Sequence, residues 1–128
     1  MGAKTLRPEP EQALLDRLLV ALRAAGWKTM HISDSRMVVN VAGRFCLAAD
    51  PLCAGWPDLF CVHLATGRLA AIECKRRGRR PRANQVDWLD VLLGAGVATF
   101  VVTGANEKAV LAELAELVAN SNINPNSK

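Results

Sequence analysis

Residues 59–75 read LFCVHLATGRLAAIECK, and this stretch decides the fold of the chain around it. Residues 59–64 and 68–75 are apolar and rich in strand-forming side chains, while residues 65–67 (ATG) are typical of a tight turn. The stretch therefore predicts an antiparallel β-hairpin. Because the turn is centred near Thr66, residues whose numbers sum to about 131–133 are expected to face each other across the hairpin.

Two acidic residues lie at the open end of this hairpin. Asp58 opens the first strand and Glu73 lies near the end of the second, so the pairing rule places their Cβ atoms about 5 Å apart. Carboxylates that close repel each other unless a proton or a cation lies between them. Since residues 70–72 are apolar, an unpaired charge there would be costly. A divalent cation resolves both problems, and carboxylate oxygens suit Mg²⁺, with Mn²⁺ as a substitute.

Lys75 follows Glu73 by two residues, so its side chain leaves the same face of the strand. A metal held by two acids beside a lysine suits phosphodiester hydrolysis, because the metal polarises a phosphoryl oxygen and lowers the pKa of a bound water. The lysine would orient that water or stabilise developing negative charge. The alternative interpretation is an ordinary acid–lysine ion pair at the edge of a sheet.

A run of cations follows the hairpin directly and contains six Lys and Arg within eight residues. Without them, the rest of the chain has ten Lys and Arg against twelve Asp and Glu, so the net charge of +4 comes from this local patch. Such a patch is typical of phosphate binding, although a solvated loop or a localisation-like tag is the alternative. The six are Lys75, Arg76, Arg77, Arg79, Arg80 and Arg82.

The rest of the chain predicts a mixed α/β arrangement around one sheet, in a single domain that spans residues 1–128. A leucine stripe predicts a first helix between the prolines at 8 and 10 and Gly26. Trp88 is expected in the core, and Trp56 is expected to brace the loop before Asp58. The remaining predicted elements are strands at 27–32, 37–41, 44–48 and 98–102, helices at 83–93 and 107–119, a loop at 50–57, and a disordered polar tail from about 120.

Composition excludes several classes of protein. Apolar residues make up 51% and charged residues 22% of the chain, which argues against intrinsic disorder. No stretch approaches the ~18 consecutive apolar residues of a membrane span, and the N-terminus has no apolar signal core, so we expect a cytoplasmic protein. The four cysteines have no CxxC spacing. Disulfides are not expected, and no spacing indicates a zinc site with His31 or His63.

Three motifs together resemble the VRR-NUC (virus-type replication-repair nuclease) family of the PD-(D/E)xK superfamily. They are GWPDLF at 55–60, IECK at 72–75 and QVDWL at 85–89, and the resemblance spans residues 11–102. It implies a restriction-endonuclease-like core, a central mixed β-sheet flanked by helices in αβββαβ order. One departure concerns residues 82–84 (RAN), because the family often has Ser/Thr-Pro just before the glutamine helix.

The resemblance also implies roles for individual residues. Lys75 would be the catalytic lysine, and Gln85 would touch metal-bound water or phosphate, although a helix-capping role for Gln85 is the alternative. Glu9 competes with Glu11 as the acidic residue of the first helix, and Asp50 is an outside candidate. The implied metal ligands are Asp58, Glu73, the backbone carbonyl of Cys74, and Glu11. The implied DNA-binding residues are Arg76, Arg77, Arg79, Arg80 and Arg82.

Stand-alone members of this family occur in phages and bacteria, and the resemblance implies homodimers that cut four-way DNA junctions. We therefore expect a Mg²⁺-dependent, structure-selective endodeoxyribonuclease of Holliday-junction-resolvase type, acting in DNA repair or recombination. A flap, end or duplex nuclease of the same superfamily is one alternative, and a non-catalytic DNA-binding module is another. The first helix, the 37–41 stretch and the last helix are all open as dimer surfaces.

Overall fold

The computed structural model describes residues 9–31, 36–49 and 54–120, with only the backbone described for residues 36–41 and 44–49. The described residues form helices and strands in the predicted order. These are α1 (Glu11–Ala24), β1 (Trp27–His31), β2 (Arg36–Val41), β3 (Arg44–Ala49), β4 (Leu59–His63), β5 (Leu69–Cys74), α2 (Ala83–Gly94), β6 (Ala98–Val102) and α3 (Glu107–Asn120). Asp50 and the predicted tail beyond residue 120 lie outside the described residues.

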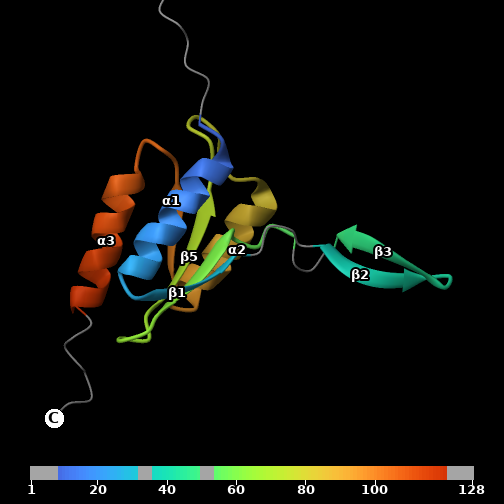
Figure 1. Cartoon of the computed structure of the whole chain (residues 1–128), viewed down its shortest axis with the longest axis horizontal. Helices are drawn as coiled ribbons and strands as arrows, with labels where there is room; N and C mark the ends of the chain where they lie inside the picture. The colour runs from blue at the N-terminus through green and yellow to red at the C-terminus, as the bar shows by residue number, and fades with distance from the viewer. Residues whose placement is uncertain (1–8, 32–35, 50–53, 121–128) are drawn as a thin grey trace, which may run out of the picture.

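The central sheet is mixed and contains β1, β4, β5 and β6, in that order. β4 is antiparallel to β1 and to β5, and β5 is parallel to β6, to which α2 connects it (Figure 1). Leu59 pairs with Ile72 in the β4–β5 ladder. The predicted pairing rule is thereby confirmed, since one further step along the ladder sets Asp58 opposite Glu73.

Three strand ends meet at one end of this sheet. β1 ends at His31, β4 begins at Leu59, and β5 ends at Cys74. Because β4 runs opposite to both of its neighbours, the end of β1, the start of β4 and the end of β5 lie side by side. Residues that lie far apart in the sequence are brought together there.

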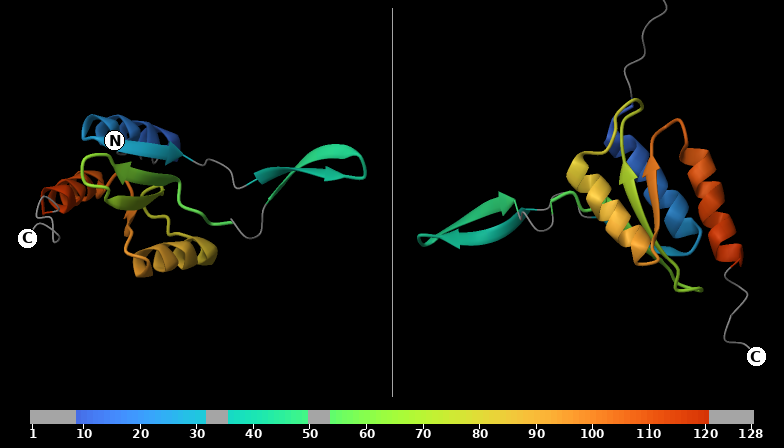
Figure 2. Two further views of the ribbon diagram at one scale, coloured as in Figure 1. Left: turned by 90° about the horizontal axis from the view of Figure 1, so that it is seen from below. Right: turned by 180° about the vertical axis from the view of Figure 1, so that it is seen from behind.

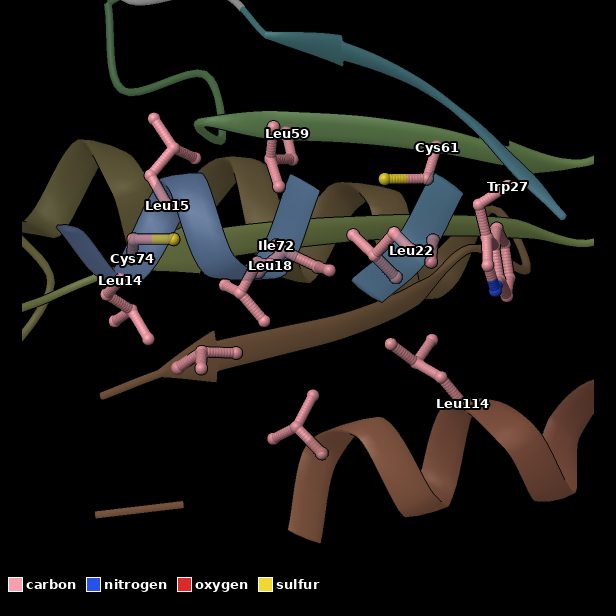
Figure 3. Close-up of a cluster of buried hydrophobic side chains, with 13 residues drawn as sticks. Leu14, Leu15, Leu18, Leu22, Trp27, Leu59, Cys61, Ile72, Cys74 and Leu114 are labelled. Atoms are coloured by element: carbon pink, nitrogen blue, oxygen red, sulfur yellow. The ribbon is translucent and has the colours of Figure 1, made fainter. Parts of the chain in front are cut away.

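Helices cover both faces of the sheet: α1 and α3 lie on one face and α2 lies on the other (Figures 1 and 2). Alternation along β5 separates the two layers, because Ile72 and Cys74 pack towards α1 and α3 while Ala71 packs towards α2. The predicted stripe of α1 fills the larger core (Figure 3). Its buried residues are Leu14, Leu15, Leu18 and Leu22.

The expectation of one sheet is wrong, because β2 and β3 form a separate two-stranded sheet. Figure 1 shows it standing apart from the four-stranded sheet. The two strands pair with each other along their whole length, from Arg36 opposite Ala49 to Val41 opposite Arg44. Ala42 and Gly43 make the turn with φ values of 51° and 80°, the positive-φ geometry that suits a two-residue hairpin loop. Because this turn brings β2 and β3 together locally, they form their own ladder and do not need strands of the central sheet as partners.

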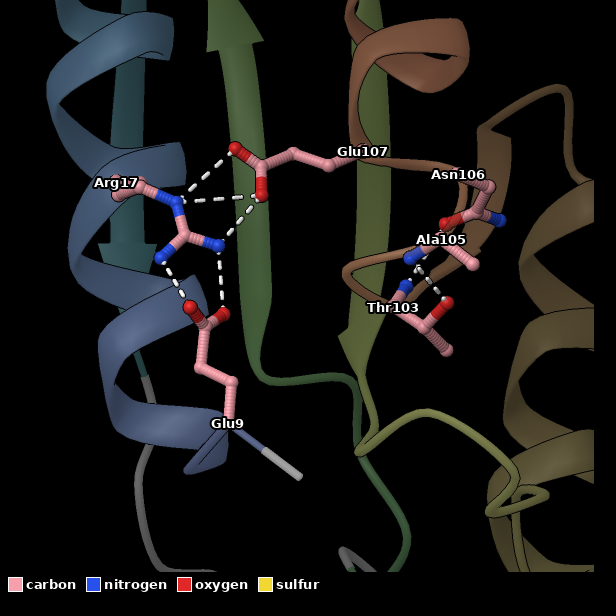
Figure 4. A network of polar contacts seen from close by, with 6 residues as sticks. All are labelled: Glu9, Arg17, Thr103, Ala105, Asn106 and Glu107. Carbon is pink, nitrogen blue, oxygen red and sulfur yellow. Dashed lines mark hydrogen bonds and ion pairs between the residues drawn. The ribbon is translucent and has the colours of Figure 1, made fainter. Parts of the chain in front are cut away.

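A surface ion cluster ties α1 to α3 (Figure 4). The Arg17 guanidinium donates hydrogen bonds of 2.6 Å to both carboxylate oxygens of Glu9 and one of 2.7 Å to Glu107. Asn106, just before α3, accepts a hydrogen bond from the Thr103 amide and donates one to the Val101 carbonyl. The start of α3 is therefore fixed against both α1 and the end of β6. No helix among the described residues has the length and apolar character needed to cross a membrane.

Candidate active site

Asp58 and Glu73 face each other at the end of the sheet where β1, β4 and β5 meet. The Cys74 amide donates a 2.8 Å hydrogen bond to Oδ2 of Asp58, which holds this carboxylate against the end of β5. Glu73 is only 2% exposed. Its Oε1 accepts a 3.0 Å hydrogen bond from Nε2 of Gln85 and lies 3.5 Å from Nζ of Lys75. The sequence-predicted pair and its lysine are thus brought together.

The surroundings of Glu73 favour a cation beside its carboxylate. Burial, and next the negative charge of Asp58, raise the pKa of Glu73 to about 8, although Lys75 opposes the shift. The second carboxylate oxygen, Oε2, is buried and has no hydrogen-bond partner among the described residues. Buried polar atoms without partners are rare in folded proteins. A cation between Asp58 and Glu73 would remove both the repulsion and the unpaired oxygen.

The donor set fits a hard, partly hydrated cation. Asp58 and Glu73 offer carboxylate oxygens, and Cys74, whose carbonyl is the third predicted ligand, follows Glu73 directly at the end of β5. Within the described ranges, no three His, Cys, Asp or Glu side chains are gathered closely enough to hold a metal ion on their own. Mg²⁺ commonly binds through one or two carboxylates and keeps several waters, so this open arrangement suits it. The residues present therefore fit a divalent cation of that kind.

Lys75 lies between the acids and the basic loop, residues 76–82. Its side chain is 12% exposed, and its amide donates a 2.9 Å hydrogen bond to the Val102 carbonyl of β6. Lys75 also lines a cavity of about 490 Å³ that the basic loop and the start of α1 enclose. The ammonium is therefore placed to act at the boundary between the acids and a bound anion.

Gln85 caps α2, as the alternative interpretation predicted, and its contact with metal-bound water or phosphate stays a prediction. Its Nε2 donates to Glu73, and its Oε1 accepts a 2.7 Å hydrogen bond from the Arg82 amide at the start of α2. The chain has no Ser or Thr at this helix start, and Arg82 gives no side-chain cap there. Gln85 therefore caps the helix and also links the end of the basic loop to the buried acid.

The loop before Asp58 is pressed against the first turn of α2. Gly55 has φ +89°, and a Cβ added there would lie 2.6 Å from the Asn84 carbonyl carbon. Trp88 of α2 donates a 3.1 Å hydrogen bond from Nε1 to the Ala54 carbonyl. The Trp56 ring packs edge-on against Trp88 with ring centres 4.9 Å apart. Trp56 thus braces this loop, while Trp88 is half-buried and holds the loop to α2.

The structure separates the two acidic candidates of the first helix. Glu9 is paired with Arg17 on the surface, away from the acids. Glu11 borders the site instead, because its carboxylate accepts a long, 3.4 Å hydrogen bond from the Arg76 amide. Burial raises the pKa of the Cys74 thiol, and the charges of Asp58, Glu73 and Glu11 add to that shift. Glu11 therefore lies near the acids, and its role as a metal ligand stays a prediction.

Most of the predicted DNA-binding arginines line one cavity. Arg76, Arg79, Arg80 and Arg82 enclose the 490 Å³ cavity together with Lys75 and residues 10–12 of the α1 start. Arg77 is exposed but does not line it. Five of the eight described residues that line the cavity are Lys or Arg, side chains that commonly contact phosphate.

The sequence model of the VRR-NUC domain matches residues 20–106, about two thirds of the chain. The chain belongs to the VRR-NUC family. Comparison with curated proteins and with solved structures found no match. A VRR-NUC domain is a nuclease of the PD-(D/E)xK superfamily, a hydrolase that acts on DNA and generally needs a divalent metal. The α/β core and the mixed sheet agree with this assignment.

The matched segment covers most of the candidate site residues described above. Asp58, Glu73, Lys75 and Gln85 lie inside it, as does the basic loop, whereas Glu11 precedes it. The two free cysteines described, Cys61 and Cys74, are buried thiols. Burial raises the pKa of the Cys61 thiol to about 12, so this group is a packing residue and not a nucleophile.

One residue beside the VRR-NUC site was not predicted to belong to the nuclease centre. His31 lines a second cavity of about 170 Å³ together with Asp58, Cys74 and the α1 residues Glu11, Gln12 and Leu15. The signal that the sequence offered was its position near the end of the strand predicted at 27–32. That signal becomes informative only when the order of strands in the sheet is known.

Proposed function

We propose that this protein is a Mg²⁺-dependent, structure-selective DNA endonuclease that works as a homodimeric Holliday junction resolvase, with Mn²⁺ able to replace Mg²⁺. One observation carries the proposal. Glu73 is buried against Asp58 with one carboxylate oxygen unpartnered, and Lys75 beside it opens onto a cavity walled by four arginines. A cation site next to an anion site is what metal-assisted phosphodiester hydrolysis requires.

The chain's own residues divide the work. Asp58, Glu73 and the Cys74 carbonyl would hold the metal, which supplies a polarised phosphate and a bound water of lowered pKa. Lys75 would orient the attacking water and stabilise the negative charge that develops on the phosphate. Gln85 holds Glu73 in place by its 3.0 Å hydrogen bond. Glu11 is proposed as a further ligand on the α1 side.

The basic loop would hold the phosphates of the cut strand. Arg76, Arg79, Arg80 and Arg82 face the cavity that Lys75 borders. Charge neutralisation by arginines releases counterions and gives salt-dependent binding without base readout. Such binding lets the shape of the DNA, and not its sequence, select the substrate.

A four-way junction and a homodimer belong together in this proposal. Two active sites related by a two-fold axis would cut two strands of a two-fold symmetric junction. Family membership supports this arrangement, as do exposed apolar side chains that a second copy would cover. On α2 these are Val86, Val91 and Leu93.

The test is cleavage of a synthetic four-way junction, beside a flap and a linear duplex, in Mg²⁺, Mn²⁺ or EDTA. Asp58→Ala and Lys75→Ala are assayed together with two matched surface variants, Asp87→Ala on α2 and Lys108→Ala on α3. Paired symmetric cuts in the junction alone, abolished in both site variants and retained in both controls, are expected. Sedimentation of the free protein should give a dimer.

Other outcomes would move or end the proposal. Cuts in the flap or the duplex that need Asp58 and Lys75 would leave the active site in place and reject the resolvase. Tight, salt-dependent junction binding without cleavage in any metal would identify a non-catalytic DNA-binding module. A monomer that makes unpaired cuts would reject the two-fold arrangement.

A further inference from the structure

His31 lies in line with the proposed catalytic residues across the end of the sheet. The strand order β1-β4-β5 places the end of β1 directly beside the start of β4, and the end of β5 on its other side. His31 pairs with Leu59, the residue after Asp58. Lys75 follows the end of β5, so His31 and Lys75 flank Asp58 from opposite sides.

The cavity that His31 shares with Asp58 is small and polar on one side. Its volume of about 170 Å³ would hold roughly five to six waters, at about 30 Å³ for each water. Glu11 borders both this cavity and the larger basic one. The two cavities therefore adjoin at the start of α1, and His31 borders the one that also contains Asp58.

The imidazole of His31 is not engaged by any of the described residues. Among the described residues it makes no hydrogen bond or ion pair, and it is exposed. The other histidine, His63, is fully engaged, since its ring nitrogens lie 2.9 Å from Thr66 Oγ1 and 3.2 Å from the Ala25 carbonyl oxygen. His31 therefore has a ring N–H available for a ligand in the cavity, in the neutral as well as the charged form.

We propose that His31 is a further catalytic residue of this site, and that its imidazole donates a hydrogen bond to an oxygen of the phosphate being cut, on the side away from Lys75. This inference rests on the proposed nuclease function. A donor aimed at the phosphate stabilises the negative charge that grows on its oxygens in the transition state. In this proposal His31 acts as a hydrogen-bond donor to the phosphate, and the Mn²⁺ affinity of the His31 variants tests this role against that of a metal ligand.

The first arm of the test compares His31→Ala and His31→Gln with Met30→Ala. Met30 is the neighbouring exposed residue on β1 and faces the other side of the sheet. Single-turnover cleavage by His31→Ala should slow on the order of 100-fold, the usual effect of removing one transition-state donor. His31→Gln, which keeps an N–H, should recover part of that rate, and Met30→Ala should match the wild type. DNA binding in EDTA and Mn²⁺ affinity should stay unchanged in all three.

The second arm does not depend on cleavage. The chain has two histidines. His31 ends β1 and His63 ends β4, so they lie at opposite ends of the β1–β4 ladder, roughly 13 Å apart along the strand direction. In an NMR titration of the full chain with Mn²⁺ alone, the ring signals of His31 should broaden at much lower Mn²⁺ than those of His63. Glu73→Gln should remove this difference.

The outcomes separate this inference from the proposed function. If the wild type cleaves DNA and His31→Ala cleaves as fast as Met30→Ala, His31 is not catalytic and the nuclease stands. If His31→Ala weakens Mn²⁺ binding, His31 is a ligand and the donor role is rejected. If the wild type cleaves nothing, the nuclease fails, and equal broadening of both histidines would then reject the placement of His31 beside the metal as well.

Discussion

The two ends of the four-stranded sheet differ in how completely their polar groups are satisfied. At one end His63 is 8% exposed, bonded through both ring nitrogens, and packed edge-on against Trp27 with ring centres 5.1 Å apart. At the other end, Glu73 has a buried oxygen without a partner and faces a second carboxylate.

This difference indicates which end of the sheet stabilises the fold and which end holds the groups for cleavage. Groups that are buried, paired and packed lower the free energy of the folded chain. Like charges held together and polar atoms left unpaired raise it, and they persist where a ligand completes them. The His63 end is therefore expected to control stability, and the Asp58–Glu73 end to control activity.

The largest expected effect is a loss of cleavage when the Asp58–Glu73 end is changed. Glu73→Gln removes the charge that would hold the metal but keeps the size of the side chain, so single-turnover cleavage should fall on the order of 10³-fold or more. The free energy of unfolding should not fall, because the buried charge and its repulsion from Asp58 disappear. Asp90→Asn, an exposed acid on α2, is the matched control. Full activity in Glu73→Gln would mean that the metal is held elsewhere.

A second variant tests whether cleavage depends on the close packing of the loop before Asp58 against α2. Gly55→Ala places a Cβ 2.6 Å from the backbone of Asn84, so α2 and its Gln85 must shift relative to Glu73. A misplacement of about 1 Å can cost on the order of 100-fold in rate. Gly67→Ala is the matched control, because it also has a positive φ, +72°, but nothing within 4 Å of the added Cβ. Equal loss of activity in both would show that backbone strain alone is responsible.

The third variant removes contacts at the His63 end and tests its contribution to the free energy of unfolding. His63→Ala removes two hydrogen bonds and an edge-on ring contact, so the free energy of unfolding should fall by about 2–4 kcal/mol, measured in urea. Cleavage per folded molecule should be retained. His31→Ala is the contrasting variant and should change the free energy of unfolding by less than about 0.5 kcal/mol. The reverse pattern would contradict the division between the two ends.

The last prediction concerns how the free energy of unfolding depends on pH. Because the pKa of Glu73 is raised from 4.5 to about 8 in the metal-free fold, the folded chain binds more protons than the unfolded chain between these values. Its free energy of unfolding should therefore fall as pH rises from about 5 to 8, and this slope should be shallower in Glu73→Gln. Added Mg²⁺ should raise the melting temperature more at pH 8 than at pH 6. A pH-independent difference between wild type and Glu73→Gln would show that Glu73 does not titrate there.

The helices and the register of the β4–β5 hairpin could be predicted from the sequence. Periodicity predicts the helices, and the turn at Thr66 sets the register that places Asp58 opposite Glu73. The residue types at Asp58, Glu73, Lys75 and Gln85 define the chemistry of the site. All of these follow from local pattern, because side-chain alternation and hairpin geometry depend on residues close in the chain.

The partners of the strands and the contacts between distant segments became known only from the tertiary structure. Strand propensity could not show that β2 and β3 pair apart from the central sheet, since it specifies an element and not its partner. The contact of Glu11 with the Arg76 amide, the contact of Gly55 with α2, and the placement of His31 beside Asp58 each join segments far apart in the sequence. Such distances follow from the packing of helices on the sheet and from the order of its strands, and no local pattern encodes them.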